Sequence, residues 1–187
     1  ALTKFLFWFK KRKKITTEKK IENKLANFRK KSSKYLYPSF DTIAGSGPNG
    51  SIIHYKSNNQ SNRTVNKNDV LLIDSGGQYK WGTTDVTRTT CTGQVSNSFR
   101  NNFTRVLKGH IAVFNCNIKQ NFNGYLIDRL ARKYLKEVGL NYSHGTGHGV
   151  GFFLNVHEGP QSISKYNKIL IKEGMILSNE PGYYLTN

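Results

Sequence analysis

The sequence is poor in cysteine and contains no long hydrophobic run. Its two cysteines, Cys91 and Cys116, lack the spacing of a structural metal site. They indicate a chain that keeps its thiols reduced, and the alternative is a disulfide between the two cysteines. The apolar stretch 1–9 is far too short to span a bilayer, and it lacks the flanking features of a signal peptide. This segment therefore predicts neither a membrane span nor a cleaved leader.

Acidic side chains are also scarce. Eleven Asp and Glu residues face 29 Lys and Arg residues, which gives a formal net charge of +18. Residues 1–34 hold thirteen of the cations and only two glutamates, and the run Lys10–Lys14 is the densest part. Such clusters can bind nucleic acid or anionic membranes. Because no aromatic-rich recognition motif accompanies this one, we interpret it as the solvated face of terminal helices.

The pattern of apolar residues predicts an α+β fold, in which strands are followed by two helices and then by more strands. Phe, Tyr and Trp make up 12% of the chain, which indicates globular order. Glycines Gly76 and Gly77 are expected to form a turn or a bulge. The expected helices are 3–12, 17–31, 97–117 and 123–138; the expected strands are 41–44, 51–55, 69–74, 78–81, 84–92, short pieces within 142–157, 169–171 and 175–180.

Two aspartates stand in strand-like contexts. Asp74 ends the apolar run 70–73, where a carboxylate is costly unless a cation compensates it. Asp85 follows eleven residues later, and two strands joined by a turn can place both carboxylates on one sheet face. The plainer alternative is two strand-end aspartates that bond to turns.

A histidine and a glutamate extend this set. His148 lies in the run 144–151, whose alternating glycines exclude a helix and allow close backbone approach. Glu180 precedes Pro181-Gly182. Three carboxylates and one imidazole suit Mn²⁺, Co²⁺ or Zn²⁺ bound with water, rather than a thiolate-type structural zinc. The alternatives are a structural histidine and a surface glutamate before a turn.

These segments resemble the catalytic domain of aminopeptidase P, the Xaa-Pro aminopeptidases of the pita-bread metallopeptidase family. The resemblance covers residues 35–187, and the run 144–160 is most similar to the cytosolic-type branch. It implies one domain over 1–187, made of basic N-terminal helices (1–34) and a ligand-bearing core (35–187). It also implies a cytoplasmic enzyme that removes the first residue from peptides with proline second.

The resemblance implies two divalent metal ions, Mn²⁺ with Co²⁺ or Zn²⁺ as alternatives. Asp74 would chelate one ion, Asp85 would bridge both, and His148 and Glu180 would complete the first ion's ligands. The family's fifth ligand, a glutamate, would fall beyond Asn187. On this basis we expect a pita-bread domain that is incomplete at its C-terminus, with a weakened second metal site and impaired activity.

Three further histidines resemble substrate-side residues of the family. His54 would contact the substrate near the scissile bond, His157 would hydrogen-bond a peptide carbonyl, and His144 would assist proton movement. The expected partners are peptides with proline at the second position. Neither a membrane nor a specific nucleic acid is expected as a partner. A homodimer is compatible with the resemblance. The rival hypothesis is a non-catalytic pita-bread module that binds nucleic acid or protein. The four ligand positions favour the enzyme.

Overall fold

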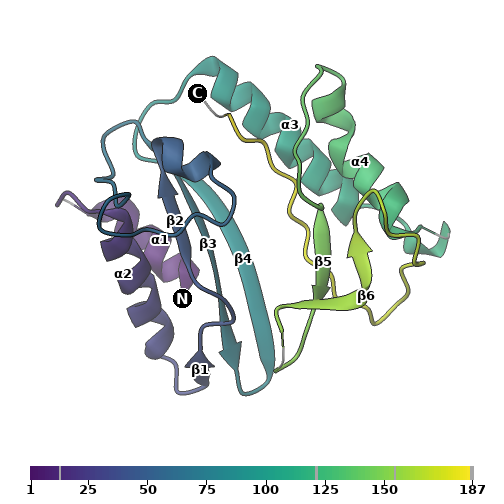
Figure 1. Cartoon of the computed structure of the whole chain (residues 1–187), viewed down its shortest axis with the longest axis horizontal. Coiled ribbons are helices and arrows are strands. Elements are labelled where there is room, and N and C mark those ends of the chain that lie inside the picture. Colours follow the sequence, from purple (N-terminus) through teal and green to yellow (C-terminus); the bar gives the residue numbers. More distant parts are fainter. Residues whose placement is uncertain (13, 121, 154, 186–187) are drawn as a thin grey trace. The chain divides into compact units, whose positions relative to one another are not determined.

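A computed structural model describes residues 1–12, 14–120, 122–153 and 155–185 (Figure 1). Lys13, in the centre of the basic run, lies outside the described residues. The contacts divide the chain into two compact units: unit 1 comprises Ala1–Val95 with Leu185–Asn187, and unit 2 comprises Ser96–Tyr184. Each unit has its own hydrophobic core. The assignment of residues 1–187 to one domain stays a prediction.

Unit 1 begins with two helices, α1 (Leu2–Lys11) and α2 (Glu18–Lys30), close to the predicted ranges. Thr17 caps α2, because its side chain accepts a hydrogen bond from the Lys20 N–H at 3.4 Å. Lysines occupy the exposed sides of both helices, whereas the two glutamates, Glu18 and Glu22, are buried. The exposed charge of α1 and α2 is therefore wholly positive.

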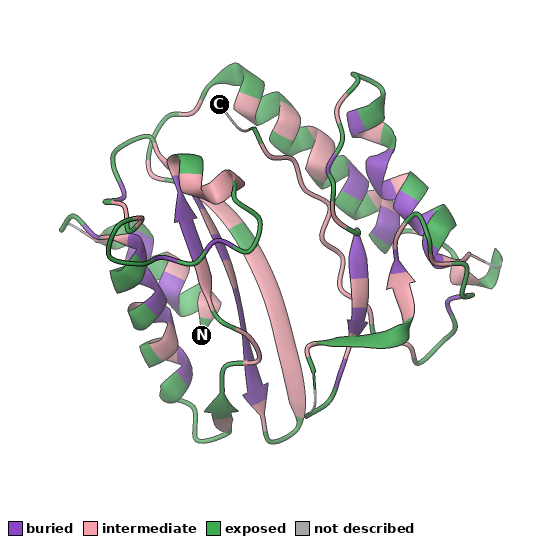
Figure 2. Ribbon diagram, viewed as in Figure 1, coloured by how far each residue is buried: buried purple, intermediate pink, exposed green. Residues whose placement is uncertain are grey.

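Four antiparallel strands form the sheet of unit 1: β1 (Tyr35–Tyr37), β2 (Ile43–Ser46), β3 (Val70–Tyr79) and β4 (Gly82–Cys91). One edge of β3 pairs with β4 along its whole length, and its other edge pairs with β1 and β2. Figure 2 shows β3 as largely buried, whereas β4 is mostly intermediate in exposure. The helices cover one face of this sheet, and the core between them contains Phe5, Phe9, Ile21, Leu25, Ala44, Val65, Leu71 and Ile73.

The predicted turn or bulge at Gly76-Gly77 was wrong, because both glycines lie inside β3 in regular register with β4, and the chain reverses at Lys80-Trp81. A Cβ on Gly76 would lie 2.0 Å from Ser39 Oγ. Glycine is thus required there for close packing rather than for a turn. The predicted strand 51–55 was also wrong: a 3₁₀ helix, η1 (Gly47–Ser51), and a turn occupy this region.

Unit 2 contains α3 (Asn97–Phe114), a short 3₁₀ helix η2 (Ile118–Gln120), α4 (Gly124–Lys136) and the antiparallel pair β5 (Gly147–Val150) and β6 (His157–Ile163). Helices α3 and α4 cross closely, since a Cβ on Gly109 would lie 2.1 Å from the Ala131 carbonyl oxygen. Within the described part, 169–171 and 175–180 form single bridges rather than the predicted strands. The core contains Val113, Ile127, Ala131, Ile163 and Ile171.

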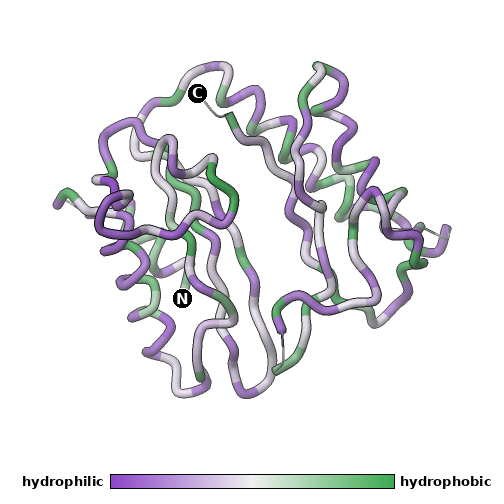
Figure 3. The backbone as a smooth tube through the Cα atoms, in the orientation of Figure 1, coloured by the Kyte–Doolittle hydropathy of each residue, from purple (hydrophilic) through white to green (hydrophobic). Residues whose placement is uncertain are grey.

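The elements of both units together make an α+β fold, as the sequence predicts. None of the helices among the described residues is long and apolar enough to cross a bilayer. Figure 3 shows polar and apolar residues interspersed along them. Both cysteines are free: Cys91 is exposed at the end of β4, and Cys116 is partly buried beside the core of unit 2.

Candidate metal-binding site

The two predicted aspartates lie on the same face of the β3–β4 hairpin. Asp74 pairs with Thr87, and Asp85 pairs with Gly76, so the two carboxylates are diagonal neighbours across the strands. Such neighbours are roughly 7 Å apart at Cβ. Leu71 and Ile73 point toward the helices, so the aspartates occupy the opposite face. Two like charges at this spacing repel, and a bound cation would offset the repulsion.

The other two predicted ligands meet within unit 2. His148 Nε2 lies 3.0 Å from Glu180 Oε1, and the side chains are 19% and 31% exposed. His148 is the second residue of β5, and the segment 177–180 runs antiparallel beside it. Ser178 N–H donates to the His148 carbonyl at 2.8 Å, and Glu180 N–H donates to the Thr146 carbonyl at 2.7 Å. This pairing brings together two residues that are 32 positions apart in the sequence.

The polarity of the His148 hydrogen bonds shows what this pair requires. Nδ1 lies 2.9 Å from the Gly149 carbonyl oxygen, which can only accept, so Nδ1 carries a proton. In the neutral ring, Nε2 would then offer a lone pair directly to a carboxylate oxygen. Two acceptors at 3.0 Å repel unless a positive charge lies between them. Either a proton or a metal ion fulfils this condition, so the donor set fits a divalent cation.

The electrostatics of Glu180 agree with a cationic partner. Burial alone would raise the pKa of this carboxyl, but hydrogen bonds from His148 and Ser178 and the charges of the nearby histidines outweigh it, and the pKa is lowered. Glu180 is therefore ionised at neutral pH. A carboxylate in this state can bind a metal ion without first losing a proton.

The glycines on both sides of His148 serve the packing around it. A Cβ on Gly147 would lie 2.1 Å from the Ser178 carbonyl oxygen, and one on Gly149 would lie 2.1 Å from the Glu158 carbonyl oxygen. The sequence predicts close backbone approach at these glycines. The close approach comes from the segments that contain Ser178 and Glu158. Any side chain at 147 or 149 would push these segments away from His148.

Two of the three substrate-side histidines lie near this pair in unit 2. The ring of His157, the first residue of β6, is 4.1 Å from that of His148 and nearly perpendicular to it. His144 Nε2 lies 3.0 Å from the hydroxyl of Tyr184, and its Nδ1 lies 2.7 Å from the Gly145 carbonyl oxygen. Nδ1 must carry a proton, so in the neutral ring Nε2 accepts from the tyrosine hydroxyl. Sequence reasoning assigned Tyr184 no role.

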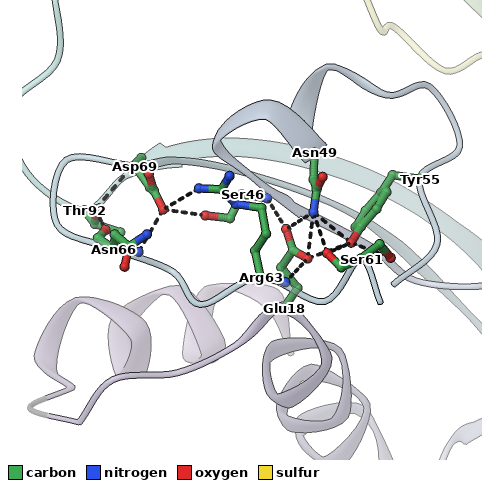
Figure 4. A network of polar contacts seen from close by, with 9 residues as sticks. All are labelled: Glu18, Ser46, Asn49, Tyr55, Ser61, Arg63, Asn66, Asp69 and Thr92. Atoms are coloured by element: carbon green, nitrogen blue, oxygen red, sulfur yellow. Dashed lines mark hydrogen bonds and ion pairs between the residues drawn. The ribbon is translucent and has the colours of Figure 1, made fainter. Parts of the chain in front are cut away.

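The third histidine, His54, belongs to unit 1. It is exposed and lies in a left-handed backbone conformation with φ +56°. Its loop is closed at the base by the buried carboxylate of Glu18, which accepts hydrogen bonds from the N–H groups of Ser46 (2.7 Å) and Arg63 (2.9 Å). Asn49 and Tyr55 inside the loop also donate to Glu18, as Figure 4 shows. Glu18 thus holds both ends of the segment 46–63.

Within each unit, the structure brings predicted site residues together. Asp74 and Asp85 share one sheet face of unit 1, and His148, Glu180 and His157 cluster in unit 2. Sequence reasoning missed the residues that support them, because a glutamate in the first turn of a helix or a helical Asp–Arg pair carries no signal of its long-range partners. These supporting residues are Glu18, Asp128, Arg132, Thr146, Ser178 and Tyr184.

Comparison with known proteins agrees with the resemblance in the motifs. The family model described as metallopeptidase family M24 matches residues 1–187. The chain belongs to metallopeptidase family M24. Its fold is the pita-bread fold of this family, since solved family structures superimpose with high scores.

Several relatives in the family carry the name aminopeptidase P. The chain is 46% identical over 190 residues to a probable Xaa-Pro aminopeptidase P of Laccaria bicolor, which covers 98% of the chain and 30% of that protein. It is 49% identical over 170 residues to aminopeptidase P2 of Arabidopsis thaliana, covering 90% of the chain and 24% of that protein. The chain therefore spans less than a third of the length of these M24 relatives.

Solved structures give the same family. The X-prolyl aminopeptidase of Caenorhabditis elegans, described as a cytosolic enzyme with a di-nuclear active site, matches with a TM-score of 0.92 and 38% identity. That match covers 99% of the chain and 31% of the nematode protein. The X-Pro aminopeptidase of Thermotoga maritima matches with a TM-score of 0.84 and 30% identity, covering 99% of the chain and 51% of that protein.

Proposed function

We propose that this M24 chain forms part of a metal-dependent aminopeptidase that removes the first residue from peptides with proline second. The observation that carries the proposal is the opposition of His148 Nε2 and Glu180 Oε1 at 3.0 Å, a pair that a proton or a metal ion can bridge and whose donor set fits a divalent cation. The names of the relatives supply the substrate class. No described contact favours the rival binding module.

The metal ligands in this proposal are Asp74 and Asp85 of unit 1 and His148 and Glu180 of unit 2. Oxygen ligands and one imidazole favour Mn²⁺, with Co²⁺ or Zn²⁺ as alternatives, and two ions are proposed by similarity to the di-nuclear nematode enzyme. When bound, such ions polarise a peptide carbonyl and activate water. Glu180 is already ionised, and His148 presents Nε2, so neither side chain needs to rearrange.

The remaining histidines are proposed to handle the substrate. His157, exposed beside His148, can donate a hydrogen bond to a peptide carbonyl. His144 accepts from Tyr184, so a proton can pass between this ring and the phenol without movement of either. His54, at the exposed end of its anchored loop, is proposed to contact the substrate. A cytoplasmic location, a homodimer, and the absence of membrane and of specific nucleic-acid partners stay predictions.

Hydrolysis of an Ala-Pro-containing peptide, compared with the matching Ala-Ala peptide, tests the proposed function in the protein expressed at its natural length. We expect cleavage only before proline, loss of activity with a chelator, and recovery with Mn²⁺. Glu180→Gln should lower kcat/KM by more than about 100-fold, because it removes an ionised ligand. Glu173→Gln, which changes an exposed glutamate of the same unit, should leave it unchanged.

Activity that persists in the Glu180→Gln variant, or that ignores the chelator, would contradict the ligand assignment. A folded protein that binds no metal and cleaves neither peptide would favour the non-catalytic binding module instead.

A further inference from the structure

An ion pair lies inside unit 2, outside the proposed ligand set. Asp128 and Arg132 are one turn apart on α4, and their side chains are only 3% and 7% exposed. Arg132 Nε donates to Asp128 Oδ2 at 2.8 Å. Burying two charges costs more than their attraction returns unless the remaining donors and acceptors also find partners. The partners of these remaining donors and acceptors therefore indicate which segments the ion pair holds in place.

The remaining donors of Arg132 all reach the segment that leads into β5. Its two terminal nitrogens donate to the carbonyl oxygens of Tyr142 (2.6 Å) and His144 (2.7 Å). A further bond reaches Asn141 Oδ1 at 2.8 Å. The guanidinium carbon also lies 3.8 Å from the centroid of the Tyr142 ring. The planar guanidinium of Arg132, with several donors in fixed directions, thus sets the distance of this segment from α4 and its orientation.

The free oxygen of Asp128 reaches the same segment further along. Thr146, which is fully buried, donates its hydroxyl to Asp128 Oδ1 at 2.6 Å, and this hydroxyl also bonds with that of Tyr142. The backbone of Thr146 bonds on both sides: its N–H donates to the Ile163 carbonyl at 2.8 Å, and its carbonyl accepts from Glu180 N–H at 2.7 Å. Thr146 therefore connects α4 to the segment that carries Glu180.

We infer that Asp128 and Arg132, acting through Thr146, are positioning residues that set the separation of His148 from Glu180. His148 lies two residues beyond Thr146, and Glu180 hydrogen-bonds to Thr146 directly. A shift of Thr146 toward or away from α4 moves both proposed ligands. The inference rests on the proposed function, since it gives the pair a role in metal binding as well as in packing.

Two variants separate positioning from simple support of α4. Arg132→Lys keeps a positive charge beside Asp128, but an ammonium group cannot reach both carbonyl oxygens as the guanidinium does. Thr146→Val keeps the side-chain volume and removes only the hydroxyl. Arg129→Lys, an exposed change on the same helix, is the matched control.

The readouts are Mn²⁺ affinity by calorimetry and, in metal-free protein at fixed pH, the histidine side-chain ¹⁵N spectrum, which reports whether His148 Nε2 still bonds to Glu180. The protein is used at its natural length. We expect Arg132→Lys and Thr146→Val to weaken Mn²⁺ binding by about tenfold to 100-fold and to shift the His148 resonances. Arg129→Lys should change neither.

A purely structural role predicts a different result: lowered thermal stability, but wild-type Mn²⁺ affinity and wild-type His148 resonances in the folded variants. That result would overturn the inference. If Arg132→Lys does not fold, Thr146→Val decides alone. If wild-type protein binds no Mn²⁺, the proposed function fails, and the metal-free spectra still decide whether the pair positions His148.

Discussion

In the run 144–151, hydrogen bonds to backbone carbonyl groups determine which ring nitrogen of each histidine carries a proton. His144 and His148 are each followed by a glycine whose carbonyl oxygen lies within 2.9 Å of the ring Nδ1. Both rings are therefore protonated at Nδ1 and present Nε2 to their partners. For His144 the partner is the Tyr184 hydroxyl, a donor, and for His148 it is a carboxylate oxygen. The same local geometry thus directs one Nε2 to a hydroxyl and the other to a carboxylate oxygen.

Tyr142 provides a test of this buried environment. Burial, only partly offset by the Thr146 hydrogen bond and the Arg132 charge, raises the pKa of its phenol from 10.0 to about 12. Because the folded-state pKa is raised, the associated stability is present below pH 10 and is lost as the pH approaches 12. The absorbance difference between wild type and Tyr142→Phe should show a tyrosinate transition near pH 12. A transition near pH 10 would contradict the buried position.

At the scale of elements, the helices could be predicted because their apolar residues follow the helical period and because Thr17 gives a clear cap. The hairpin turn could not, because Gly76 and Gly77 serve close packing against Ser39 and Tyr35, and sequence alone does not distinguish the two uses of glycine. The segment 175–180 was predicted as a strand, but among the described residues it forms a single bridge. Its pairing with His148 depends on contacts 30 residues apart.

The loop that carries His54 gives a prediction at this scale. Glu18→Gln replaces an acceptor oxygen with an N–H donor that faces other donors at the base of segment 46–63. We expect a loss of about 2–4 kcal/mol in the free energy of unfolding, since at least one buried donor loses its partner. Chemical denaturation measures this loss, and hydrogen exchange should become faster across 46–63.

The control is Asp41→Asn, which breaks an exposed ion pair with Lys56 in the same unit. Such surface pairs contribute little, so its stability should stay near that of wild type. Equal effects of the two substitutions would show that Glu18 does not anchor the loop.

At the scale of the whole chain, the few acidic residues are concentrated where they have a specific task. Six of the eleven are proposed metal ligands or are buried in polar networks, whereas the net charge is +18. A basic surface repels free cations, so metal affinity must come from the local ligands. The six are Glu18, Glu22, Asp74, Asp85, Asp128 and Glu180.

The sequence motifs were sufficient to identify the family and to nominate the ligands, because those residues lie in short, distinctive runs. The residues that hold them were not predictable. Arg132 contacts carbonyl groups, which carry no side-chain signature, and Glu18 reaches partners up to 45 positions away. Support of this kind becomes visible only when the fold brings distant segments together.

The most direct test of the central claim is anomalous X-ray scattering from crystals of the natural-length protein grown with Mn²⁺. We expect anomalous peaks within bonding distance of the Asp74 and Asp85 carboxylates, of His148 Nε2 and of the Glu180 carboxylate. Full Mn²⁺ occupancy elsewhere, with none of these four side chains as a ligand, would contradict the claim.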